Sequence, residues 1–144
     1  MESSFGEIPI NINLKNIEIA QNRSIRNICN APYNAHTTIL YKKLGILKLN
    51  DLYKIQLGKM MYEYSRLILP TPLIDLFTPN RNIHEHNTRN RNAPHFITRT
   101  YNASKSFLHQ GPKLWSTLAN EHKISKTTKS FTKTFKKMLI SEYL

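Results

Sequence analysis

Cysteine and glycine are scarce in this 144-residue sequence, and it contains no long apolar run. The single Cys29 excludes an internal disulfide framework and a zinc site made of several cysteines. The four glycines are isolated, which excludes a glycine-rich phosphate-binding loop. No apolar stretch approaches the roughly 18 residues that cross a bilayer, and the first ten residues contain acids but no base, so we expect neither membrane insertion nor secretion. The expected location is intracellular, in the nucleus or the cytoplasm.

Acidic residues are also few, since nine Asp and Glu stand against 21 Lys and Arg and the formal net charge is +12. The nine acids are scattered, and no two lie close enough in sequence to suggest a two-metal site. We therefore assign no catalytic residue, metal, cofactor or small-molecule substrate to the chain. The excess of positive charge instead favours a polyanionic partner such as nucleic acid.

The apolar residues that are present recur at helical spacing, which predicts an all-α fold, a small helical bundle. Helices are predicted over residues 14–28, 37–45, 51–69, 111–118 and 129–143, with a single turn over 73–77. The expected N-caps are Asn13, Thr37 or Thr38, and Asn50, while Gly45 ends the second helix and Pro112 occupies the first turn of the fourth. The chain thus divides into a helical region over 1–69, a basic loop rich in Asn and Arg over 70–110, and a C-terminal helical extension over 111–144.

The middle of the chain, residues 78–99, shows little periodicity and carries several arginines that suit phosphate, Arg81, Arg89 and Arg91 among them. A disordered tether explains this segment equally well, and residues 95–101 fit a short strand. Three histidines, His84, His86 and His95, invite a metal reading, but their spacing is not that of the HExxH zinc motif. Polar loop histidines are the favoured interpretation.

Lysines dominate the C-terminal region. They recur three and four residues apart, so they form a cationic face opposite an apolar stripe that contains Phe131 and Phe135; they are Lys129, Lys133, Lys136 and Lys137. Such a face can neutralise phosphates and release their counterions, independently of base sequence. The alternative is an ordinary solvated lysine face. The only tryptophan, Trp115, fits a core anchor better than a base-stacking platform.

Several strings occur together in a familiar order: QNRSIRNI over 21–28, LGILKLNDLYKIQ over 44–56 with KMMY over 59–62, HNTR over 86–89, GPKLW over 111–115, and SF and FKK near the end. In this order they resemble the segment after the polymerase palm of non-LTR (LINE-type) retrotransposon reverse transcriptases, over nearly the whole chain. The resemblance implies a helical thumb, followed by a C-terminal extension, that grips the template–primer duplex. It places Gln21, Arg23 and Arg26 on the helix nearest nucleic acid and makes Gly111, Pro112 and Trp115 fold-forming.

The catalytic aspartates of that family, carried on a palm motif of the YxDD type, are absent from this sequence. We therefore expect a non-catalytic fragment of an RNA-directed DNA polymerase that contacts the backbone of RNA or an RNA/DNA duplex. The candidate binding residues are Gln21, Arg23, Arg26, Arg81, Arg89, Arg91, Lys129, Lys133, Lys136 and Lys137.

Two other hypotheses remain open from the sequence. The chain fits a vestigial helical fragment that needs a polymerase palm as its partner to fold, because each amphipathic helix has an apolar face to cover. A small metal nuclease built on His84, His86 and His95 is the weaker one.

Overall fold

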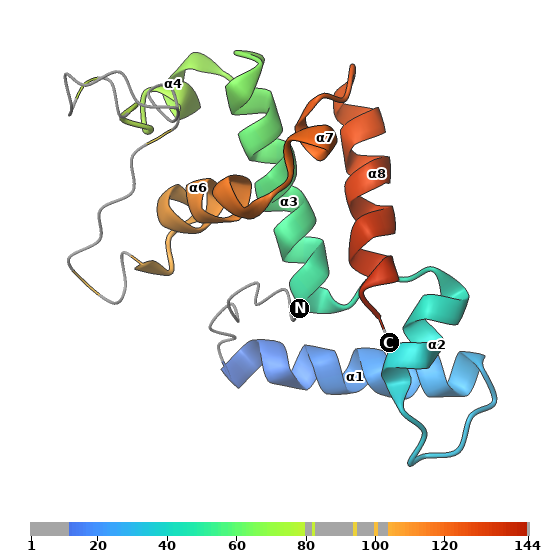
Figure 1. Ribbon diagram of the computed structural model, residues 1–144. Coiled ribbons are helices and arrows are strands. Elements are labelled where there is room, and N and C mark those ends of the chain that lie inside the picture. Colours follow the sequence, from blue (N-terminus) through green and yellow to red (C-terminus); the bar gives the residue numbers. More distant parts are fainter. Residues whose placement is uncertain (1–11, 80–81, 83–93, 95–99, 101–103, 144) are drawn as a thin grey trace. The chain divides into compact units, whose positions relative to one another are not determined.

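The computed structural model describes residues 12–79, 82, 94, 100 and 104–143, and this part of the chain is helical, without a named strand (Figure 1). The all-α prediction is therefore confirmed. The helices are α1 (Ile12–Ile28), α2 (Thr37–Leu44), α3 (Leu49–Ser65), α4 (Thr71–Ile74), α6 (Phe107–Thr117), α7 (Asn120–Lys123) and α8 (Thr128–Ser141). None of these described helices is both long and apolar enough to span a bilayer. Most of the predicted 95–101 strand lies outside the described residues. Pro79 and Pro94, which are described, form one isolated bridge.

Several predicted helix starts were wrong by one or more residues. Helix α1 begins at Ile12 and α3 at Leu49, so Asn13 and Asn50 lie inside first turns and cap neither helix. Before α2, the N-cap is His36, whose side chain makes no capping hydrogen bond. Asp51 does stand in the first turn of α3, where its negative charge suits the positive end of the helix dipole.

Three helices end in the same way, with a residue in the left-handed conformation. These residues are Asn30 after α1, Gly45 after α2 and Leu67 after α3. In each case the next backbone N–H reaches back five residues, as when Ile68 N–H donates to Glu63 O at 2.9 Å. The predicted stop at Gly45 is confirmed. Helix α3 was predicted to continue to residue 69 but ends at Ser65, because Leu67 turns the chain.

Replacing Leu67 with glycine is expected to stabilise the protein by about 0.5–1 kcal/mol, because a left-handed conformation costs a β-carbon-bearing residue roughly 1–2 kcal/mol. Little burial is lost, since the Leu67 side chain is 78% exposed. Urea unfolding of the two proteins measures the difference. The matched control is Ile68→Gly, at an exposed neighbour without the positive φ; stabilisation by both variants, or by neither, would contradict the assignment.

Helix α6 was predicted to begin at Gly111 and Pro112, but it begins earlier, at Phe107. Ser106 is its N-cap, and the Ser106 side chain accepts a hydrogen bond from Leu108 N–H at 3.3 Å. Gly111 and Pro112 therefore lie inside the helix, and the prediction that they open it was wrong. Their position has another reason: a β-carbon at Gly111 would lie 2.9 Å from Met61 Sδ, so glycine allows α6 to cross close to α3 (Figure 1).

Contacts divide the chain into two compact units. The first unit contains residues Met1–Ile55 and Thr132–Leu144, and the second contains Gln56–Phe131, so the division falls within α3 and α8. In the second unit, Met61, Leu69 and Phe77 form a buried cluster, and Trp115 packs against it. Trp115 is partly buried, and its ring centroid lies 5.9 Å from that of Phe131, so it packs against the core of the second unit, as predicted, without being fully enclosed in it.

The first unit is fastened at the C-terminal end of the chain by Tyr143. The hydroxyl group of this buried side chain donates to Asp51 Oδ2 at 2.5 Å and accepts from Lys48 N–H at 2.9 Å. Lys54 Nζ lies 3.0 Å from the other oxygen of Asp51. The Asp51 carboxylate, itself buried, is thereby supplied with a donor at each oxygen.

Replacing Tyr143 with phenylalanine is expected to cost about 1–3 kcal/mol near neutral pH, because Asp51 loses a donor and Lys48 N–H an acceptor. Burial, together with the hydrogen bond to Asp51, raises the pKa of Tyr143 above its ordinary value of 10.0. Because the pKa is higher in the folded state than in the unfolded state, the Tyr143 hydroxyl group contributes its full stabilisation below pH 10.0. This contribution decreases as the pH rises above 10.0, where the unfolded state loses the proton more readily than the folded state. Urea unfolding at rising alkaline pH should show a smaller loss in Tyr143→Phe than in the wild type, and equal losses would refute this role. Tyr41 and Tyr53, whose pKa values burial also raises, are unchanged in both proteins.

Candidate nucleic-acid interface

The lysines of α8 lie on the solvent side of that helix. Thr127 is the N-cap of α8, since its side-chain oxygen accepts a hydrogen bond from Ser130 N–H at 3.1 Å. The start of the helix determines which residues face the core and which face solvent. In the first unit, Phe135 and Leu139 point into the core, whereas Lys133, Lys136 and Lys137 are exposed. Lys129, earlier in α8 and part of the second unit, is exposed as well. The predicted separation of a cationic face from an apolar stripe is confirmed for α8.

Three lysines of this face lie in the first unit and are called the cationic face from here on, Lys133, Lys136 and Lys137, and none of them pairs with an acid among the described residues. The ion pairs of the described residues join Lys54 to Asp51 and Lys59 to Glu63, and neither involves the cationic face. Neighbouring like charges three or four residues apart on a helix repel each other by a few tenths of a kcal/mol. An anion that binds to the cationic face is therefore attracted by the lysines and also reduces the repulsion between them.

Glu142 is the acid nearest to this face in sequence, and the structure gives it other surroundings. The side chain of Glu142 is exposed, yet partial desolvation raises its pKa, while Lys54 lowers the pKa and Asp51 raises it. These partners belong to the start of α3 rather than to the α8 lysines. The charges at the start of α3 therefore influence Glu142 within the first unit.

The α1 residues of the predicted site have structural partners. Gln21 Nε2 donates to Leu47 O at 3.0 Å, which ties α1 to the segment before α3. Arg26 Nε donates to Ala35 O at 3.1 Å, in the loop before α2. Of the three, only Arg23 has an exposed side chain that is left without such a bond in the described structure. Gln21 and Arg26 thus connect α1 to the segment before α3 and to the loop before α2.

Other basic side chains of the first unit were not singled out in the sequence. Lys42 and Lys43 are exposed in the last turn of α2, ahead of Gly45. Basic residues there also complement the negative end of the helix dipole, so the pair gives no specific signal for a ligand. Tyr33, in the loop before α2, is strongly exposed, and no signal in the sequence pointed to it either.

The remaining candidates fall where the structure gives no description. Arg81, Arg89 and Arg91 lie outside the described residues, and so do His84, His86 and His95. Within the part that is described, no three His, Cys, Asp or Glu side chains gather in a way that could hold a metal ion.

Comparisons of the chain with protein-family models, with curated proteins and with solved structures found no match.

Proposed function

We propose that this chain is a non-catalytic module that binds nucleic acid through its phosphates, as a thumb-like segment of a non-LTR retrotransposon reverse transcriptase would. The expected ligand is RNA or an RNA/DNA duplex. The observation that carries the proposal is the exposed cationic face of α8, which lies opposite buried Phe135 and Leu139 and has no acidic partner among the described residues.

The chemistry of that face suits a backbone ligand rather than a base sequence. A lysine ammonium group is a compact point charge that binds phosphate without fixing one geometry. Several such charges along one helix displace condensed counterions from a polynucleotide, and this release drives binding that is independent of sequence. The formal net charge of +12 adds long-range attraction to the same ligand.

Fluorescence anisotropy with labelled RNA/DNA duplexes of unrelated sequence tests the proposal. Because phosphate contacts carry no sequence information, duplexes of equal length should bind with similar affinity. A strong preference for one sequence would contradict backbone binding, and the absence of binding to all of them would contradict the function itself.

A second candidate is a helical fragment that needs the polymerase palm of its parent element to complete its fold. The observation in its favour is the exposure of three apolar side chains of α1: Leu14, Ile17 and Ile28 are 37%, 53% and 64% exposed. Apolar surface of this kind commonly marks a missing partner. A calorimetric scan separates the two candidates, because an independent module unfolds cooperatively, whereas a fragment that lacks its partner shows no cooperative transition.

A further inference from the structure

We propose that Tyr33 is a base-stacking residue, and that the first unit therefore prefers nucleic acid with unpaired bases over a continuous duplex. The inference rests on the proposed function and makes its ligand more specific. It is drawn from the α1–α2 loop, which the sequence analysis left without a role.

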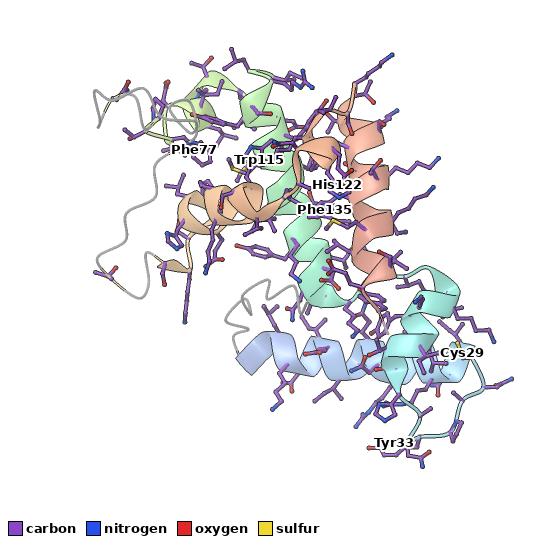
Figure 2. All side chains as sticks on the ribbon, viewed as in Figure 1. Cys29, Tyr33, Phe77, Trp115, His122 and Phe135 are labelled. Carbon is purple, nitrogen blue, oxygen red and sulfur yellow. The ribbon has the colours of Figure 1, made fainter. Side chains whose placement is uncertain are left out.

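The side chain of Tyr33 is exposed to solvent and is not packed into the core. Its side chain is 81% exposed, the highest value among the large apolar and aromatic side chains of the described residues. Figure 2 shows it at the outer end of the α1–α2 loop. Apart from the side approached by Arg26, the ring is open to solvent, so one of its faces is available to a ligand.

The loop that carries Tyr33 is held in a defined shape. Ala35 N–H donates to Pro32 O at 2.9 Å, which closes a turn with Tyr33 and Asn34 at its centre. On the α1 side, Ala31 N–H donates to Arg26 O at 2.9 Å, and Asn30 adopts the left-handed conformation. Tyr33 therefore stands on a turn that is fastened on both sides.

Arg26 links the aromatic ring to a positive charge. Its Nε donates to Ala35 O, and its guanidinium carbon lies 5.7 Å from the centre of the Tyr33 ring. This cation–π contact limits the motion of the ring, so less conformational entropy is lost when a base stacks on it. The same guanidinium group provides charge for the phosphate next to a stacked base.

An unpaired base is the ligand that this arrangement fits. Every base has a π-face, and stacking on an aromatic side chain beside cationic groups is how single strands are bound without sequence preference. Within a continuous duplex the base faces are already stacked on one another and cannot reach Tyr33. Arg26 is the cationic group beside the Tyr33 ring, and exposed Arg23, Lys42 and Lys43 add positive charge elsewhere in the first unit.

The test compares a labelled oligothymidylate strand with a labelled blunt-ended duplex, using the full chain. Tyr33→Ala should weaken binding of the single strand by about 5- to 100-fold, the range that a lost base stack produces, and should change duplex binding less than about twofold. Tyr33→Phe keeps the ring and should retain the wild-type affinities. The matched control is Ile28→Ala, another exposed apolar side chain of the first unit that lacks a π-face.

A second readout is independent of affinity. A strand containing 2-aminopurine changes its fluorescence when that base leaves the strand stack for a protein ring, so wild type and Tyr33→Phe should alter the signal and Tyr33→Ala should not. Far-ultraviolet circular dichroism verifies that each variant is folded.

The outcomes separate this inference from the proposed function. If the wild type binds both probes and Tyr33→Ala weakens both equally or neither, the stacking role is overturned while backbone binding stands. If the wild type binds neither probe, both proposals are overturned.

Discussion

Replacing Lys133, Lys136 and Lys137 together with glutamine is expected to weaken binding to an RNA/DNA duplex on the order of a hundredfold at about 0.1 M salt. Each phosphate contact contributes about 0.9 to the slope of log affinity against log salt for a B-form duplex. Loss of three contacts should therefore reduce the magnitude of the slope by about 2–3. Fluorescence anisotropy over a series of salt concentrations measures both quantities.

A control variant separates the cationic face from the total charge. Lys15, Lys113 and Lys126 are exposed lysines outside this face, and their joint replacement by glutamine changes the net charge equally. We expect this control to keep most of the affinity and nearly the whole slope. Equal losses in the two triple variants would show that net charge, and not the face on α8, determines binding.

Replacing Phe131 with alanine is expected to destabilise the second unit by about 3–5 kcal/mol. The Phe131 side chain is fully buried, its ring stacks on Tyr62 at 4.8 Å, and the Trp115 ring lies 5.9 Å away. Truncation removes this apolar contact and leaves a cavity between α3, α6 and α8. Since domains of this kind have total stabilities of about 5–15 kcal/mol, the loss is a large part of the whole.

Urea unfolding followed by fluorescence of the single Trp115 measures this change where it occurs. Phe131→Leu is the matched control, because it keeps most of the apolar volume and should cost clearly less than alanine. A Phe131→Ala protein with wild-type stability would contradict the packing described for the second unit.

The features that could be predicted from the sequence depend on local periodicity. The lysines and phenylalanines of α8 recur at fixed spacings, and the helix phase alone places them on different faces. The Gly45 stop is also local, because glycine is the usual residue for a left-handed helix end. Both predictions are confirmed for this reason.

Contacts distant in sequence and unusual residue choices could not be predicted from the sequence. Gln21 and Arg26 donate to Leu47 and Ala35, and no local pattern names those partners. Leucine at a left-handed position gives no warning, so Leu67 was read as part of α3. At α6, Gly111 and Pro112 suggested a helix start, whereas the N-cap is Ser106. Gly111 lies inside the helix, where the lack of a β-carbon allows it to approach Met61.

The most direct test of the account is the salt dependence of wild-type binding to an RNA/DNA duplex. We expect measurable binding at low salt and a log affinity that falls linearly with log salt concentration. The cationic face alone should give this line a negative slope with a magnitude of about 2–3. Binding that does not change with salt, or no binding at low salt, would contradict it.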